Sequence, residues 1–239
     1  MPDFADYYNG FYEKLALIDA KHNSIDKIQD FIPDYKPGIK VLDMGCGYGS
    51  VSSEFIKAGC EVYGMEINKK CFPELEKKGF KIIEHDFSQP FKSTQSFDLV
   101  LLLDVLEHVF NPLAMLKWVP NLLSENGRII ISVPLYFDLI DRLRILFTGK
   151  IVSYDNSCYG KELYAKFRSY NYDHIRFFCP DEVFEMCDKL GLTVEKVRYC
   201  PMQINSGLFC YVTKLIANKY TVKLAPSLLA HSMVLRLRK

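Results

Sequence analysis

The stretch Lys40-Val41-Leu42-Asp43-Met44-Gly45-Cys46-Gly47-Tyr48-Gly49 decides the fold of this 239-residue chain. Its first five residues form a short run typical of a β-strand, and the run breaks into a glycine loop. Residues 50–58 then follow the pattern of a helix that ends at Gly59. A glycine loop between a strand and a helix is the place where a doubly wound sheet binds a nucleotide-like ligand.

The same alternation continues along the chain. We predict strands at 61–66, 81–85, 97–103, 128–133, 192–199 and 231–237, and helices at 5–33, 68–78, 110–123 and 180–190. Parallel strands joined by helices require crossover connections, which place helices on both faces of the sheet. The sequence therefore predicts an α/β fold with a doubly wound, mostly parallel sheet.

We interpret residues 1–239 as one domain with four parts. Residues 1–39 form a helical cover, 40–134 the cofactor-binding half, and 179–239 the carboxyl-terminal part of the sheet. The aromatic-rich insertion 135–178 has no clean strand period and is predicted to cap the acceptor site. Its alternative role is to add a small satellite core.

Composition excludes several classes of protein. Hydrophobic residues make up 49% and charged residues 25%, which predicts a packed core. The 30 basic and 29 acidic side chains nearly cancel, so a nucleic-acid partner is not expected. The eight cysteines form no C-x-x-C pair, which favours buried reduced thiols. With no secretory signal and no apolar run long enough for a transmembrane segment, we expect a cytoplasmic protein. The oligomeric state is left open.

The glycine loop departs from a dinucleotide-binding loop in two ways. Its third glycine comes one residue early, and Asp43 adds a carboxylate where a pyrophosphate would lie, which favours a phosphate-free cationic ligand. Glu66, 19 residues after Gly47, is placed to accept hydrogen bonds from ribose hydroxyls. Asp86 and Phe87 follow the third strand and suit an adenine amino group and ring.

With these residues, the run from Lys40 to Lys239 resembles the class I S-adenosylmethionine-dependent methyltransferases. The resemblance implies a seven-stranded Rossmann-like sheet whose last strand is antiparallel to the others. It also implies that the glycine loop and Asp43 surround the methionine part of the cofactor, while Glu66 holds the ribose and the Asp86-Phe87 pair meets the adenine. The residues predicted to bind S-adenosylmethionine are Asp43, Gly45, Cys46, Gly47, Gly49, Glu66, Ile67, Asp86, Phe87 and Leu103.

A second set of polar residues follows the strand at 97–103. Asp104, Glu107 and His108 come at its end, and His174 precedes a later helix, so the two regions should meet over the cofactor. This pattern resembles ubiquinone-biosynthesis O-methyltransferases and bacterial small-molecule or glycan methyltransferases. It is also similar to the metal-binding arrangement of small-RNA 2′-O-methyltransferases, in which a glutamate stands at the position of Asp104.

An acceptor hydroxyl holds its proton tightly, so its methylation needs a general base or a metal that lowers the hydroxyl pKa. We predict His108, His174 and Glu107 as catalytic residues. If a divalent metal is present, its ligands are Asp104, Glu107, His108 and His174, and the choice among magnesium, manganese, iron and zinc stays open. The alternatives are a metal-free base and a structural role in which these side chains cap a helix and anchor a loop.

The sequence thus predicts methyl transfer to an oxygen of a small metabolite, a quinone precursor or a sugar or glycan precursor. The alternatives are an inactive S-adenosylmethionine-binding or scaffold protein and an RNA 2′-O-methyltransferase. Residues 135–147, with Arg142 and Arg144, are amphipathic, and residues 235–239 are basic. Either segment could be a solvated face or could contact a membrane surface or a phosphorylated acceptor.

Overall fold

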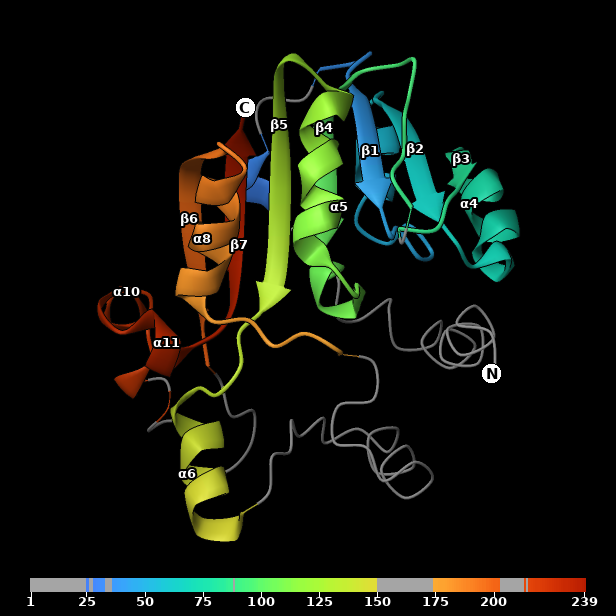
Figure 1. Cartoon of the computed structure of the whole chain (residues 1–239). Helices are drawn as coiled ribbons and strands as arrows, with labels where there is room; N and C mark the ends of the chain where they lie inside the picture. Colours follow the sequence, from blue (N-terminus) through green and yellow to red (C-terminus); the bar gives the residue numbers. More distant parts are fainter. Residues whose placement is uncertain are drawn as a thin grey trace.

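The computed structural model describes residues 25, 28–32, 36–87, 89–149, 174–202, 213 and 215–239. Seven strands form one sheet in the order β3-β2-β1-β4-β5-β7-β6 (Figure 1). Their bounds are β1 Lys40–Met44, β2 Glu61–Glu66, β3 Lys81–Glu84, β4 Phe97–Leu103, β5 Leu123–Pro134, β6 Thr193–Pro201 and β7 Ala230–Arg238. Strand β7 is antiparallel to both β5 and β6, while the pairs among β1 to β5 are parallel. The predicted fold class is confirmed.

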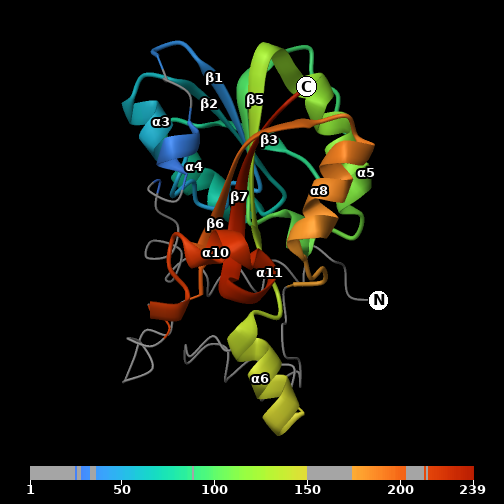
Figure 2. The ribbon, with the colours of Figure 1, turned by 90° about the vertical axis from the view of Figure 1, so that its left-hand side faces the viewer.

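Helices cover both faces of the sheet (Figure 2). The elements α3 (Ser53–Lys57) and α4 (Phe72–Lys78) lie on one face, and α5 (Pro112–Trp118) and α8 (Pro180–Lys189) lie on the other. At the edge where the parallel strands end lie α6 (Leu139–Thr148), α10 (Thr221–Leu224) and α11 (Pro226–Leu229). The 3-10 helices are η2 Gln29–Phe31, η3 Lys69–Cys71, η4 Leu106–His108 and η5 Val119–Leu122.

Alternate residues of the strands enter two separate cores. Leu42 and Leu102 are fully buried in the core under α5 and α8, whereas Val41 and Leu101 are fully buried in the core under α3 and α4. Successive side chains of a strand point to opposite faces, so a strand covered on both faces must be apolar almost throughout. This explains the apolar pair Val41-Leu42 in β1 and the apolar run 99–103 in β4.

Two helices are shorter than expected. The helix predicted at 50–58 is α-helical only over α3, because residues 50–52 form a turn. The helix predicted at 110–123 begins at Pro112, where the Asn111 side chain accepts a hydrogen bond from the Ala114 amide. It passes into η5 after Trp118, because Pro120 has no N–H to continue the α-helical bonding.

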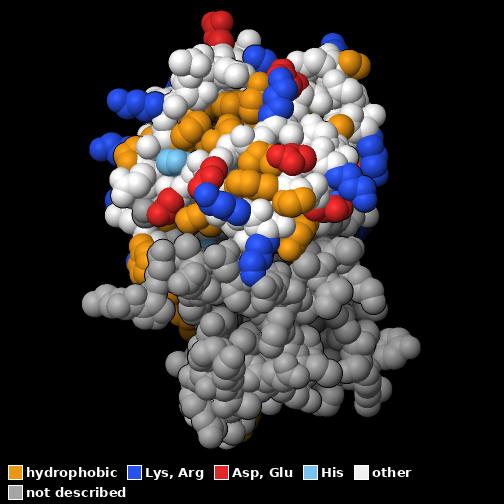
Figure 3. All heavy atoms as spheres, turned by 90° about the vertical axis from the view of Figure 1, so that its right-hand side faces the viewer, with side chains coloured by type: hydrophobic (Ala, Val, Ile, Leu, Met, Phe, Trp, Pro, Cys, Tyr) orange, Lys and Arg blue, Asp and Glu red, His pale blue; other side chains and the backbone are white. Residues whose placement is uncertain are grey.

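Other predictions fall wholly or largely outside the described residues. They include most of the helix at 5–33 and the cap segment 150–173. Within the described ranges, no helix is long and apolar enough to cross a membrane. On the face that carries β3 and α4, the described residues show basic and acidic side chains interspersed around apolar ones, so this described part has no large field of one sign (Figure 3).

Candidate active site

The glycine loop is fastened to β2 and packed from two sides. The Gly45 amide donates a hydrogen bond to the Met65 carbonyl at 2.8 Å. Gly45 has φ +73°, and a Cβ there would lie 2.9 Å from Val105; Gly49 has φ +70°, and a Cβ there would lie 2.5 Å from Phe80. Any other residue would meet both backbone strain and a steric clash at these two positions.

Glu66 is the last residue of β2, and its carboxylate contacts this loop. The residue is 2% exposed. It accepts hydrogen bonds from the amides of Gly47 at 3.0 Å, Ile67 at 2.8 Å and Asn68 at 2.9 Å. The carboxylate therefore fixes the glycine loop against the end of β2. Its position at the pocket wall is the one that the ribose assignment requires, and that assignment stays a prediction.

The electrostatic environment of the loop favours a cation. Asp43 is 5% exposed and accepts a hydrogen bond of 2.5 Å from the Ser52 hydroxyl. Burial, and after it the carboxylates of Asp43 and Glu66, raise the pKa of the Cys46 thiol well above its ordinary value. The same negative field that disfavours a thiolate would stabilise a sulfonium and an ammonium group.

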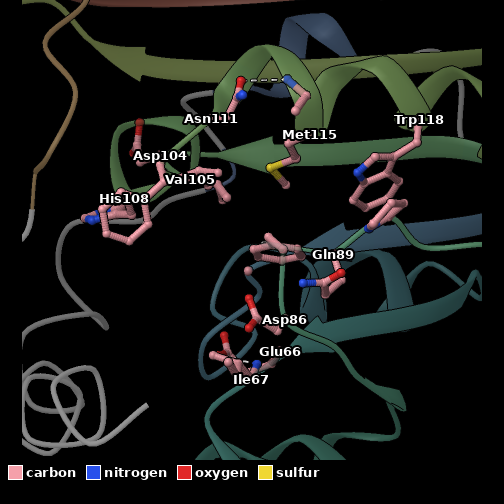
Figure 4. Close-up of a pocket in the computed structure, with 16 residues that line it drawn as sticks. Glu66, Ile67, Asp86, Gln89, Asp104, Val105, His108, Asn111, Met115 and Trp118 are labelled. Atoms are coloured by element: carbon pink, nitrogen blue, oxygen red, sulfur yellow. Dashed lines mark hydrogen bonds between the residues drawn. The ribbon is translucent and has the colours of Figure 1, made fainter. Parts of the chain in front are cut away.

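A pocket of about 400 Å³ opens in front of the loop. Glu66, Ile67 and Asp86 form one wall, and Met115 on α5 faces them across the cavity (Figure 4). The full lining is Gly45, Glu66, Ile67, Asp86, Phe87, Gln89, Pro90, Asp104, Val105, His108, Val109, Phe110, Asn111, Ala114, Met115 and Trp118. The acids and the apolar side chains together provide polar positions for a nucleoside and a dry surface for a flat ring.

Half of the residues predicted to bind the cofactor line this pocket. They are Gly45, Glu66, Ile67, Asp86 and Phe87. The other five are not among the lining residues. Asp43 lies in β1, the glycine loop contains Cys46, Gly47 and Gly49, and Leu103 packs against the core under α3 and α4.

The wall of the pocket formed by α5 was not predicted from the sequence. Asn111, Met115 and Trp118 recur at a spacing of four and three residues, so they occupy one face of the helix. That spacing was the available signal.

The second predicted set contains a compact cluster. Glu107 Oε1 lies 3.9 Å from Nε2 of both His108 and His174. One ligand atom from each residue can be chosen so that all three atoms lie within 4.8 Å of one another, and the two imidazole ring centres are 4.8 Å apart. Glu107 is 1% exposed, so its carboxylate is removed from bulk water. We call Glu107, His108 and His174 the Glu-His-His cluster.

Backbone hydrogen bonds bring the distant histidine to this cluster. The amides of Ile175 and Arg176 donate to the Glu107 carbonyl at 2.9 and 3.1 Å. The Arg176 guanidinium also donates to the Phe110 carbonyl through its Nε at 3.0 Å. The segment that carries His174 is therefore anchored to η4 rather than placed by its side chain alone.

The structure adds one side chain to the cluster and places another outside it. The Tyr136 hydroxyl hydrogen-bonds to Nδ1 of His174, while Nε2 of that ring faces Glu107. Asp104 has φ +54°, and its Oδ1 accepts a hydrogen bond from the Ser132 hydroxyl at 2.8 Å. Asp104 lines the pocket but does not belong to the Glu-His-His cluster.

Comparisons with known proteins identify the family of this chain. A family model described as a methyltransferase domain matches residues 16–197. The ubiquinone biosynthesis O-methyltransferase of a Ruegeria species is 28% identical over 162 residues, which cover 65% of this chain and 60% of that protein. The enzyme of the same name from Aeromonas salmonicida is 27% identical over 191 residues, covering 72% and 73% of the two chains.

A solved methyltransferase supports the fold independently. The S-adenosylmethionine-dependent methyltransferase of Archaeoglobus fulgidus superposes with a TM-score of 0.59 at 20% identity, covering 98% of this chain and all of that one. The family match extends over most of this chain, and the sheet order, glycine loop and strand-end acids agree with it. The chain therefore belongs to the class I S-adenosylmethionine-dependent methyltransferases.

Proposed function

We propose that this protein transfers a methyl group from S-adenosylmethionine to a hydroxyl oxygen of a small molecule. The observation that carries the proposal is the position of His108, which lines the cofactor pocket and also belongs to the Glu-His-His cluster. A group that is ligand-capable or basic thus lies within one connected cavity with the predicted cofactor residues. The names of the curated relatives, which specify O-methylation in ubiquinone biosynthesis, support oxygen as the acceptor atom.

The chemistry of the transfer explains the need for such a cluster. In the reaction, a bond forms between the acceptor oxygen and the methyl carbon, and the carbon–sulfur bond breaks with its electron pair staying on sulfur. The cofactor supplies a good leaving group, so positioning provides much of the rate enhancement. The proton of the acceptor hydroxyl must also leave, which requires a base or a metal beside the oxygen.

We propose further that the Glu-His-His cluster holds a divalent metal. One carboxylate and two imidazoles are a donor set suited to zinc, iron or manganese. Two ligand atoms, each about 2.1 Å from a shared ion, lie at most about 4.2 Å apart. The two separations from Glu107 Oε1 are 3.9 Å, whereas the three atoms together lie within 4.8 Å of one another, so the side chains would move slightly closer around an ion. When bound, the metal would lower the pKa of an acceptor hydroxyl.

The chain's own residues hold this arrangement. Tyr136 fixes the ring of His174, as an outer partner of a ligating histidine commonly does. The backbone bonds from Ile175 and Arg176 keep that ring over Glu107. The pocket wall beside His108 is mainly apolar, which keeps water away from the reacting oxygen.

Radiolabelled S-adenosylmethionine tests the acceptor assignment. The purified protein would be incubated with a catechol, a monophenol, a monosaccharide and a primary amine, each with and without added manganese or zinc. We expect label in a hydroxyl-bearing compound, and loss of that label after the protein is treated with a chelator. Labelling of the amine alone would overturn O-methylation, and chelator-resistant labelling of a hydroxyl would assign the cluster to metal-free base catalysis.

A further inference from the structure

The carboxyl-terminal part of the chain has an unusual charge distribution. All 29 acidic residues lie at or before Glu195, and residues 196–239 contain eight Lys and Arg residues. The whole chain is nearly neutral, but all the Lys, Arg, Asp and Glu side chains of its final segment, residues 196–239, are basic. Arg198 pairs with Asp30, and Arg236 and Arg238 pair with Glu195, so Lys219 and Lys223 are the exposed basic residues of this segment that bear on the argument.

Helix α6 carries an apolar stripe that continues beyond the core. Leu139 and Ile140 pack partly buried against the core under α5 and α8. One and two turns later, Leu143, Leu146 and Phe147 continue the same helical face at exposures of 44, 73 and 79%. The stripe is thus anchored at one end of the helix and open to solvent at the other.

The α10 segment presents a second group of exposed apolar side chains. Leu215, Tyr220 and Leu224 are 78, 70 and 87% exposed. Lys219 and Lys223 lie among them and are also exposed, and the Lys219 ammonium is 5.0 Å from the centre of the Tyr220 ring. Apolar tips, a tyrosine and interleaved lysines are typical of a segment at a membrane–water interface.

These two groups lie on one edge of the molecule. Helix α6 follows the carboxyl end of β5, and α10 lies between the carboxyl end of β6 and the start of antiparallel β7. Arg142 on α6 donates a hydrogen bond to the Ser227 carbonyl on α11 at 3.0 Å, which joins the two segments. The pocket lies at this same edge of the sheet, because its lining residues Glu66, Asp86 and Asp104 stand at or just after the carboxyl ends of β2, β3 and β4.

We propose that this edge docks on an anionic lipid surface. We call Leu143, Leu146, Phe147, Leu215, Tyr220 and Leu224, with Lys219 and Lys223, the docking edge. Among the described residues, ten large hydrophobic side chains are exposed, and seven of them belong to α6 or the α10 segment. Their apolar tips enter the headgroup region while the lysines pair with lipid phosphates. The inference does not depend on methyl transfer, although docking would turn the pocket toward acceptors with an apolar tail.

Sedimentation with sucrose-loaded vesicles tests the docking edge without any acceptor or turnover. The full chain is expected to bind vesicles of equal phosphatidylglycerol and phosphatidylcholine at least about tenfold more tightly than pure phosphatidylcholine vesicles. Leu146→Asp/Phe147→Asp should weaken binding to the anionic vesicles by about tenfold or more. Lys219→Glu/Lys223→Glu should weaken it by a similar factor and reduce its salt dependence.

A matched control adds the same two negative charges at the opposite edge. Asn121→Asp/Asn126→Asp changes exposed residues beside the start of β5 and should leave vesicle binding within about twofold of the parent. Thermal unfolding and S-adenosylhomocysteine titration establish that each variant is folded. A parent protein that stays in the supernatant at millimolar lipid, or an α6 variant that sediments equally well, would overturn the proposal. So would a parent dimer that the α6 variant converts to monomer, since the occupant of the edge would then be a second copy.

Discussion

The glycine-loop region, from β1 to β3, and the Glu-His-His cluster are built by different means. Between β1 and β3, the predicted cofactor residues lie at or near the ends of strands. The loop is held by bonds to the neighbouring strand, from Gly45 to the Met65 carbonyl and from Gly47 to Glu66, which span 20 and 19 positions of sequence. In the Glu-His-His cluster, His174 reaches Tyr136 and Glu107 across 38 and 67 positions of sequence. Local pattern specifies the first region, and chain docking specifies the second.

This difference implies that the two regions can be damaged separately. Substitutions in the Glu-His-His cluster should remove turnover and spare cofactor affinity. Substitutions in the glycine loop should weaken cofactor affinity and spare turnover measured at saturating S-adenosylmethionine. The following predictions test that separation, beginning with the largest expected effect.

Removing either histidine of the cluster should have the largest effect. His108→Ala and His174→Ala are each expected to lower turnover at least about a hundredfold, because each removes a metal ligand. The double variant should lose little more, since the ligands act as one unit. Steady-state rates and elemental analysis measure both effects. Two single variants with full activity would leave only a structural role for the cluster.

Removing the strand-end acid should weaken the cofactor. Glu66→Ala is expected to reduce S-adenosylmethionine affinity by about 2 to 4 kcal/mol, since each hydrogen bond to a carboxylate contributes about 1.5 to 3. Calorimetric titration measures this change. Glu66→Gln serves as the matched variant, because it removes the charge and one acceptor oxygen but keeps the second oxygen and the size of the side chain. Overlapping titration curves for Glu66→Ala and the parent would contradict the assignment.

The same substitution of glycine by alanine should cost different amounts of stability in the glycine loop and at the end of α6. Gly49→Ala is expected to cost about 3 kcal/mol of unfolding free energy, from left-handed backbone strain and from the clash with Phe80. Gly149→Ala, at φ +64° with open space around it, should cost only about 1 kcal/mol. Denaturant unfolding compares the two variants. Equal costs would show that steric packing does not define the loop.

The tyrosine behind the cluster should act through His174. Tyr136→Phe is expected to lower metal affinity by about ten- to a hundredfold, because it removes the outer hydrogen bond of a ligand. Tyr63→Phe removes a hydroxyl that donates to Glu61 at 2.7 Å in the cofactor half, and it should leave metal affinity unchanged. Metal titration followed by competition with a chelator measures both. Equal losses in the two variants would show a general effect on folding.

The smallest effect concerns alkaline pH. Burial raises the pKa of the Cys187 thiol from 9.0 to about 11. The unfolded chain therefore loses this proton first, so the stability contributed by the neutral thiol is complete below about pH 9 and is lost as the pH rises toward 11. Cys187→Ala should unfold at a lower denaturant concentration at pH 8 but lose less stability between pH 8 and pH 10. An unchanged pH dependence would contradict the burial effect.

The same contrast explains what could be predicted from the sequence. The bounds of β1, β2 and β4 agree with the predicted strands at 40–44, 61–66 and 97–103, because strands covered on both faces are apolar runs with clear ends. The proximity of His174 to Glu107 was expected, but its cause was not, since backbone hydrogen bonds leave no trace in side-chain pattern. Tyr136 belongs to the aromatic-rich insertion 135–178, and nothing in the sequence distinguishes it from the other aromatic residues there.

The remaining features differ in how far the sequence pattern could identify them. The face of α5 that lines the pocket has helical spacing, but in sequence it is indistinguishable from a core stripe. The placement of Asp104 depends on a positive φ and on a bond to Ser132 of the neighbouring strand β5, and neither can be deduced from composition. The glycine loop was recognisable because its backbone needs that residue type at fixed positions.

One measurement tests the central claim most directly. S-adenosylhomocysteine would be titrated into metal-loaded protein and into chelator-treated protein. In the same two samples, methyl transfer from radiolabelled S-adenosylmethionine to the hydroxyl-bearing acceptor would be measured. The account predicts cofactor affinities within about twofold of each other and a fall in turnover of at least about a hundredfold after chelation. Unchanged turnover in protein shown to be metal-free, or a parallel loss of cofactor affinity, would contradict it.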